Sequence, residues 1–139
     1  AEDGIRDSVA SRGLGDVYKR QLKRIMEGRT EKGDPVQLAQ LAGIMGGKKT
    51  SDLIPLCHAL PGASIEVELE AALDLPGFRA RASAKYTGKT GVEMEALTAV
   101  SIALLTVYDM VKAVDRGMYI EGIRLISKKG GASGSWSSD

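Results

Sequence analysis

Apolar residues recur with helical spacing in two stretches of the chain. The first stretch follows Asp34, which can cap a helix that starts at Pro35. Four of its apolar residues share one helical face, which we expect to lie in the core: Leu38, Leu41, Ala42 and Met45. The second stretch runs from Val92 to Ala113, and its apolar surface extends to another side at Ile102 and Leu105. Because one sheet covers a single side of a helix, this pattern predicts contact with a partner subunit.

Two further stretches alternate apolar and polar residues, as strands with one wet face do. Residues 64–70 carry a row of glutamates, residues 78–86 carry a row of arginines and lysine, and Pro76-Gly77 lies between them. The pattern predicts an antiparallel hairpin in which the two charged rows face one another. We expect a last strand over residues 118–126, with a bulge at Glu121-Gly122, and then a Gly/Ser-rich tail.

Residues 1–21 show neither helical nor strand periodicity. Residues 7–21 resemble translated sequencing-adapter sequence, so we interpret residues 1–21 as a non-native or disordered segment and residues 22–139 as one domain. In an alternative interpretation, residues 16–18 form a makeshift strand at the open edge of the sheet. The ordered elements then run helix, strand, strand, helix, strand. This order predicts an α+β fold with a split β-α-β pattern whose first strand is missing or replaced.

The composition fits one soluble domain, since 43% of the 139 residues are apolar and 27% are charged. A net charge of +1 provides no overall field that would steer the protein onto nucleic acid or an anionic membrane. One cysteine and one histidine cannot form a disulfide framework or a four-ligand zinc site. The longest uncharged apolar stretch, residues 96–108, is shorter than the roughly 20 residues of a membrane span. We therefore expect a cytoplasmic protein with no nucleic-acid or membrane partner.

Several polar residues are candidates for chemistry. Asp109 and Lys112 interrupt the apolar end of the long helix at i and i+3, which places them on one face. They form either an ordinary ion pair near a helix C-terminus or an acid/base pair in which the aspartate orients the lysine. His58, the only histidine, is either a hydrogen-bonded structural residue or a proton carrier near neutral pH. Cys57 is interpreted as packing, because no second histidine is present to act as its base.

Lysines near Gly, Ser or Thr in loops and at element ends are typical of phosphate sites, although scattered surface lysines are usually only solvated. The chain has six of this kind: Lys32, Lys48, Lys49, Lys89, Lys128 and Lys129. Residues 130–134 form either a phosphate-binding loop or a flexible tail, and their composition favours the tail. Ordinary kinase and dinucleotide-binding functions are not supported, because neither a Walker-type loop nor a G-x-G-x-x-G motif is present.

Three segments together resemble one family closely. They are Lys32-Gly33-Asp34, residues 52–58 (DLIPLCH), and residues 87–99 (TGKTGVEMEALTA) with their continuation at 108–114 (YDMVKAV). These motifs resemble the cyclic pyranopterin monophosphate synthases of molybdenum cofactor biosynthesis, and the likeness runs from about Leu22 to Gly134. The family is similar in fold to ferredoxin-like α+β domains, in which helices pack on an antiparallel sheet. Residues before Leu22 do not match the family's opening strand.

The resemblance implies a lyase that converts 3′,8-cyclo-7,8-dihydroguanosine 5′-triphosphate to cyclic pyranopterin monophosphate and pyrophosphate. It implies a small nucleotide-derived substrate, and neither a cofactor nor a metal is expected. It also implies a homohexamer, a trimer of dimers whose active sites lie at subunit contacts. We therefore expect Lys32 and Lys112 to reach one active site from different chains.

The family's functional residues can be carried over where the motifs match. The expected catalytic residues are Asp109, Lys112, Lys32 and His58. The expected substrate-binding residues are Leu56, Cys57, His58, Met94, Glu95 and Lys128. Lys48 and Lys49 match a basic pair of the family. Three positions depart from its pattern, namely Ala59 in place of proline, Lys129 in place of serine and Ala132 in place of lysine, and the last removes one phosphate contact.

Two other functions are considered. A binding module for RNA or another ligand on such a sheet would need exposed aromatic residues on the strands, and Phe78 is the only phenylalanine. The other alternative is a synthase-like domain that is inactive because it has lost its N-terminal strand.

Overall fold

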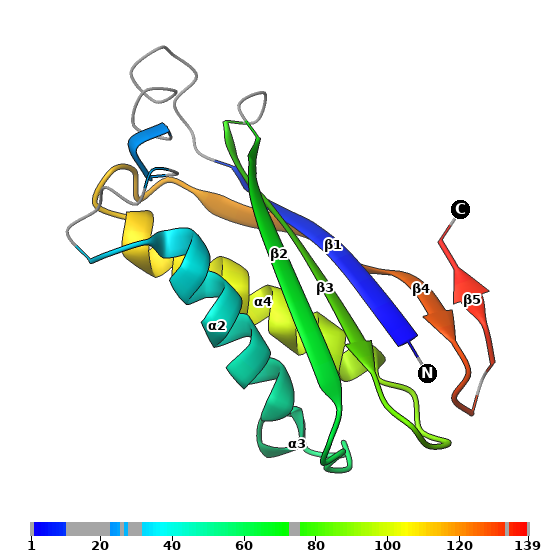
Figure 1. Ribbon diagram of the computed structural model, residues 1–139. Coiled ribbons are helices and arrows are strands. Elements are labelled where there is room, and N and C mark those ends of the chain that lie inside the picture. The colour runs from blue at the N-terminus through cyan, green and yellow to red at the C-terminus, as the bar shows by residue number, and fades with distance from the viewer. Residues whose placement is uncertain are drawn as a thin grey trace.

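Two long helices cover one face of a five-stranded antiparallel sheet (Figure 1). The computed structural model describes residues 2–10, 23–25, 27, 32–72, 76–132 and 134–138. The elements are β1 (Glu2–Ala10), α2 (Pro35–Lys48), α3 (Thr50–Leu53), β2 (Ser64–Ala72), β3 (Gly77–Lys85), α4 (Glu93–Val111), β4 (Tyr119–Lys129) and β5 (Trp136–Ser137). The strand order is β2-β3-β1-β4-β5. The first four strands thus have the split β-α-β arrangement of ferredoxin-like domains, and the predicted α+β class is confirmed.

The opening strand of this arrangement is present. β1 lies in the middle of the sheet and pairs with β3 along its whole length and with β4 on its other side. The expectation of no regular structure before Leu22 is therefore wrong for Glu2–Ala10, whose backbone groups are paired in two ladders. Residues 16–18, the alternative strand, lie outside the described residues. The division of the chain at residue 21 and the non-native origin of residues 1–21 stay predictions.

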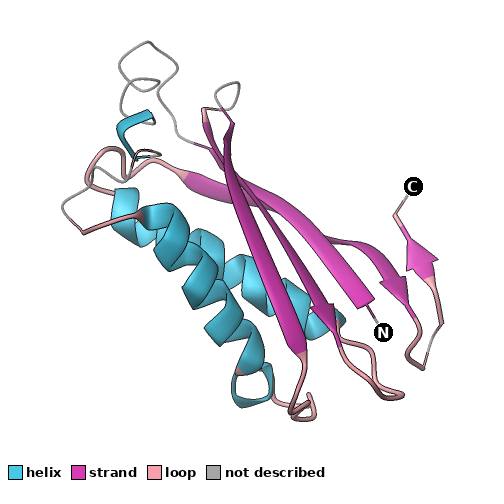
Figure 2. Ribbon diagram, in the orientation of Figure 1, coloured by secondary structure: helices cyan, strands magenta, loops and turns pink. Residues whose placement is uncertain are grey.

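The hairpin of β2 and β3 has the predicted register. Glu68 lies opposite Arg81 and Glu70 lies opposite Arg79. Both long helices lie on one face of the sheet (Figure 2). The alternate side chains of β3 are buried beneath the helices: Phe78, Ala80, Ala82 and Ala84. The bulge expected in β4 is also present, because its register with β1 shifts between Glu121 and Arg124. Gly122 within the bulge has a φ of +72°, a conformation that glycine adopts without strain.

The buried face of α2 is not the one that the spacing of large apolar residues predicted. Asp34 caps the helix as expected, since its Oδ1 accepts from the backbone N–H of Val36 at 3.0 Å. However, Leu38, Leu41 and Met45 are exposed, and the buried residues are Pro35, Ala39, Gly43 and Gly47.

Close packing between α2 and α4 explains this correction. A Cβ atom placed on Gly43 would lie 2.8 Å from the Ala99 carbonyl oxygen, and one placed on Gly47 would lie 3.0 Å from the Glu95 carbonyl oxygen. Only small residues allow the two backbones to approach this closely, so the large side chains of α2 are turned outward.

The helix α4 provides much of the core. Val100, Leu104 and Val107 are fully buried, and Leu105 is exposed. Ile102 lies against Gly46 of α2, so α2 covers part of the second apolar side that was expected to meet a partner subunit. By length and composition alone, α4 is long and apolar enough to cross a membrane. However, half of its apolar stretch is buried inside the protein. This burial is what the central helix of a folded domain shows. The C-terminal tail also contains a short strand, because β5 pairs with β4 at Ser127 and Lys128.

Candidate active site

Three of the predicted catalytic residues meet at the C-terminal end of α4. Asp109 lies in the last turn of the helix and Lys112 is its C-cap residue. Lys112 Nζ donates a hydrogen bond to Asp109 Oδ1 at 2.7 Å. Lys32 Nζ lies 3.8 Å from Asp109 Oδ2 and 3.4 Å from the Asp109 carbonyl oxygen. One carboxylate thus holds two ammonium groups, and we call Lys32, Asp109 and Lys112 the lysine cluster.

The lysine cluster is open to solvent and positively charged. The Asp109 side chain is 60% exposed and the Lys112 side chain 35%. The hydrogen bond and the charge of Lys112, together with the charge of Lys32, hold the pKa of Asp109 below its usual value. Asp109 therefore stays ionised at neutral pH and is an acceptor and orienting group, while the lysines carry the protons that could be transferred.

The lysine cluster lies within one chain, so the expectation that Lys32 and Lys112 come from different chains is wrong. The reason is the antiparallel packing of α2 on α4. Gly47 at the end of α2 lies beside Glu95 near the start of α4, and the beginning of α2 therefore lies near the end of α4. Figure 1 shows the start of α2 beside the end of α4. Lys32, which shortly precedes α2, is thereby brought to Asp109.

A second group of predicted residues lies at the N-terminal end of α4. Lys128 on β4 is buried, and its Nζ lies 3.1 Å from Oε1 of Glu93, the first residue of α4. Met94 and Glu95 follow directly in the first turn of the helix. Lys128 is therefore placed beside two of the other predicted substrate-binding residues.

Glu95 lines a cavity of about 310 Å³ at this end of the helix. The other lining residues come from the end of α2, from α3 and from the loop before β2: Gly47, Lys48, Ser51, Ala59, Leu60, Pro61, Gly62 and Ala63. Burial raises the pKa of the Glu95 carboxyl, the charge of Glu93 adds to this effect, and a backbone hydrogen bond opposes it. A buried carboxyl that resists ionisation and faces a cavity is suited to exchange hydrogen bonds or a proton with a bound heterocycle.

The segment Leu56–His58 lies in the loop between α3 and β2. Leu56 is 94% exposed, His58 is exposed and Cys57 is half-buried. The next residues of this loop line the Glu95 cavity, so the segment belongs to the N-terminal end of α4. Within the described residues, no hydrogen bond or ion pair joins His58 to the lysine cluster. The structure therefore does not bring all four predicted catalytic residues together in one chain.

The predicted site is divided along α4. Met94 and Asp109 are separated by about 22 Å at the rise of an α-helix. The lysine cluster and the Glu95 cavity consequently lie at opposite ends of α4. One small substrate cannot touch both groups within a single chain.

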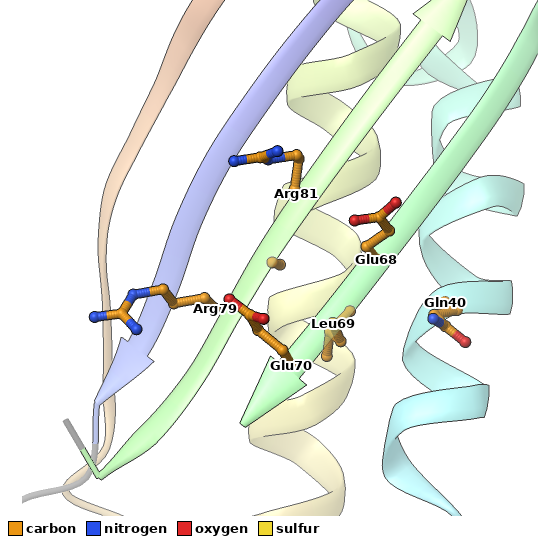
Figure 3. A pocket seen from close by; sticks show the side chains of 7 residues that line it. Gln40, Glu68, Leu69, Glu70, Arg79 and Arg81 are labelled. Atoms are coloured by element: carbon orange, nitrogen blue, oxygen red, sulfur yellow. The ribbon is translucent and has the colours of Figure 1, made fainter. Parts of the chain in front are cut away.

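A larger cavity, of about 500 Å³, lies elsewhere and includes none of the predicted site residues. It is lined by Gln40, Leu69 and Ala80 together with two glutamates and two arginines, and Figure 3 shows these charged side chains rising from β2 and β3: Glu68, Glu70, Arg79 and Arg81. Because two carboxylates and two guanidinium groups balance one another, this cavity lacks the positive charge that a triphosphate requires.

Sequence reasoning missed Glu93 as a functional candidate. Acidic residues are common at the start of a helix because the helix dipole favours negative charge there, so the sequence gives Glu93 no distinctive signal. The contact of Glu93 with Lys128 joins residues 35 positions apart, and no local pattern reveals such a contact.

Known proteins are similar to this chain over nearly its whole length. The MoaC family model matches residues 3–131, so the likeness begins well before Leu22, where we expected it to start. A cyclic pyranopterin monophosphate synthase of Cereibacter sphaeroides is 56% identical over 126 residues, which are 91% of this chain and 79% of the relative. The proteins of the same name from Dinoroseobacter shibae and Methylobacterium sp. strain 4-46 are 54% identical over 136 residues and 60% identical over 118 residues. The aligned region is 97% of this chain and 86% of the Dinoroseobacter protein, and 85% of this chain and 74% of the Methylobacterium protein.

The structure and the comparisons agree about the type of protein. The ferredoxin-like sheet with its two covering helices is the fold that the motifs implied. The family match spans β1 to the turn after β4, and it includes both ends of α4. The chain belongs to the MoaC family.

Proposed function

We propose that the chain is a cyclic pyranopterin monophosphate synthase, a lyase of molybdenum cofactor biosynthesis that releases pyrophosphate. Its substrate is the nucleotide-derived 3′,8-cyclo-7,8-dihydroguanosine 5′-triphosphate, and the protein acts in the cytoplasm without a nucleic-acid or membrane partner. Relatives of 54–60% identity with this name support the activity. The observation that carries it in the structure is the lysine cluster, in which one carboxylate orients two ammonium groups.

The two groups of residues supply different parts of the chemistry. A triphosphate needs cations, and opening and closing a ring needs proton donors and acceptors. Lys32 and Lys112 provide both positive charge and protons, and the ionised Asp109 keeps their ammonium groups in place. Glu95 and its cavity receive the heterocyclic end of the substrate, with Leu56–His58 beside them. An inactive domain without its first strand is not favoured, because β1 occupies that position.

The division of the site along α4 requires a second chain. If two copies pack the outer faces of their helix layers together about a twofold axis, the C-terminal end of α4 in one copy meets the N-terminal end in the other. The outer face is apolar enough for such a contact, since Leu38, Leu41, Met45 and Leu105 are exposed on it. Each site then combines one copy's lysine cluster with the partner's Glu95 cavity. We infer that such dimers are the units of a homohexamer.

Mixing inactive variants tests both the activity and the shared site. Turnover of the cyclised GTP substrate, measured as pyrophosphate release and pterin fluorescence after oxidation, establishes the reaction. Lys112→Met chains mixed with His58→Ala chains should regain activity after subunit exchange, because half of the sites in a mixed dimer contain only unaltered residues.

The matched control mixes Lys32→Ala with Lys112→Met. These residues belong to one lysine cluster, so every site in a mixed dimer retains one defect and activity should stay absent. Recovery in this control, or verified exchange without recovery in the first mixture, would refute the shared site.

A further inference from the structure

Three segments that are distant in sequence meet around the start of α4. They are residues 87–91 before the helix, the first turn of the helix, and residues 128–131 at the end of β4. An ion pair joins two of these segments, with Lys128 Nζ 3.1 Å from Glu93 Oε1. The Lys128 side chain is only 9% exposed and the Glu93 side chain 31%, whereas Asp109 in the lysine cluster is 60% exposed. The Glu93–Lys128 pair is therefore more enclosed than the lysine cluster, and its cation is buried.

Two glycines leave the space that this pair occupies. A Cβ atom on Gly91 would overlap Glu93 Oε2 and lie 3.1 Å from Lys128 Nζ. A Cβ atom on Gly131, whose φ is +77°, would lie 3.1 Å from Lys128 Cε and 3.2 Å from the Gly91 Cα atom. Side chains at these positions would thus displace the pair, and the loop before α4 and the turn after β4 touch each other over it.

The charge of Lys128 is already engaged. A phosphate that approached its ammonium group would also meet the Glu93 carboxylate, and two anions at one buried cation repel each other. Removing either partner leaves an uncompensated charge in a largely enclosed place, which is costly. The environment therefore suits a cation that holds protein segments together better than one that binds substrate phosphate by itself.

We propose that Glu93 is a positioning residue, which holds Lys128 and thereby fixes the first turn of α4 and the Gly130-Gly131 turn as one unit. The unit presents Met94 and Glu95 to the substrate. The predicted change in turnover rests on the proposed function. The predicted change in local order rests only on the ion pair. Glu93 and Lys128 thus act together, and neither residue holds the two segments in place without the other.

A double-mutant cycle distinguishes this role from direct phosphate binding. The variants are Glu93→Gln, Lys128→Met and the combination of both, and Arg124→Met, which removes an exposed cation from the same strand, is the control. Each single variant should raise KM about tenfold and leave kcat within about threefold, and the combination should be no worse than the worse single variant. Arg124→Met should change neither constant. If Lys128→Met raises KM and Glu93→Gln does not, or if the two single effects multiply in the combination, Lys128 is an independent phosphate ligand and the proposal is wrong.

Hydrogen exchange provides a readout that does not depend on activity. In the protein without substrate, Glu93→Gln and Lys128→Met should each accelerate exchange at Met94, Glu95, Gly130 and Gly131 together, while amides near Asp109 keep their rates. Faster exchange at only one of the two segments, or at neither, would overturn the proposal. If the exchange result holds but no variant and no wild-type protein turns the substrate over, the proposed function fails and the positioning role stands.

Discussion

The two ends of α4 hold carboxyl groups whose pKa values move in opposite directions. At the C-terminal end, Lys112 and Lys32 lower the pKa of the exposed Asp109. At the N-terminal end, burial raises the pKa of Glu95 beside its cavity. Enzymes that use acid and base chemistry at one pH commonly separate their titratable groups in this way. Asp109 thus stays ionised between its two lysines, whereas the Glu95 carboxyl at the other end takes up a proton more readily.

The two ends also differ in how their ion pairs contribute. The lysine cluster is solvated, and an exposed pair of this kind contributes little to folding, so its geometry is available for function. In the Glu93–Lys128 pair the cation is buried, and we expect the loss of either partner to disturb the surrounding segments. Substitutions at the two ends should therefore have opposite profiles, with activity lost at the first and local order lost at the second.

The largest effect is expected from removing β1, the strand at the centre of the sheet on which α4 packs. A chain that begins at Leu22 lacks β1, which pairs with β3 and with β4 from the Lys128 end to the Tyr119 end. Loss of a central strand should abolish cooperative unfolding and assembly, measured by circular dichroism during heating and by sedimentation. A melting temperature within a degree or two of that of the full chain would instead show that residues 1–21 are dispensable, as their sequence suggested.

Asp109→Asn should abolish function at the open end without unfolding the protein. Without its charge the side chain cannot hold both ammonium groups, and turnover should fall roughly 10² to 10⁴-fold. The melting temperature should stay within about two degrees, because the group is exposed. Lys112→Met should behave alike. Activity within about tenfold of the wild type, or a large loss of stability, would show that the cluster is a structural ion pair.

Leu41→Glu tests whether the two ends belong to one site through a second chain. A carboxylate in an apolar contact between helix layers should weaken association at least about a hundredfold and reduce turnover in parallel. Analytical ultracentrifugation over a dilution series measures the association. Gln40→Glu adds the same charge on another side of α2 and should leave association intact. Equal association for both variants would place the subunit contact on a different surface.

The smallest expected effect is one on stability: Glu95→Gln should change how the stability of the protein depends on pH. Because the folded-state pKa of Glu95 lies above its usual value of 4.5, the folded protein binds more protons than the unfolded chain as pH rises past that value. Stability therefore falls with rising pH until the folded-state pKa is passed. Thermal melts between pH 4 and pH 7 should show the variant gaining up to a few degrees relative to the wild type as pH rises. A constant difference would mean that Glu95 is not perturbed.

The best sequence predictions concerned features with short-range geometry. Alternation in residues 64–70 and 78–86 was enough for the hairpin and its facing charged rows, because side chains in a strand alternate between two faces. The cap at Asp34 and the pairing of Asp109 with Lys112 also follow from helix geometry over a few residues. In each case the partners are close in sequence or joined by a tight turn.

The failed predictions concerned what packs against what. The face of α2 with Leu38, Leu41 and Met45 was expected in the core, but the close approach to α4 requires the small residues Gly43 and Gly47 there. β1 has no apolar alternation, yet backbone pairing with two neighbouring strands places it in the centre of the sheet. A periodicity argument detects neither effect, because both depend on surfaces presented by distant segments.

By itself, the sequence determined the α+β class, the long central helix, the hairpin register and the identity of most candidate site residues. These follow from local periodicity and from long motifs that resemble one family. Only the tertiary structure decided that Lys32 joins Asp109 within one chain, that Lys128 is buried against Glu93, and that the candidate residues divide between the two ends of α4. The physical reason is that antiparallel packing of α2 on α4 and the pairing of β4 in the sheet set these distances, and both arise from contacts between segments far apart in the chain.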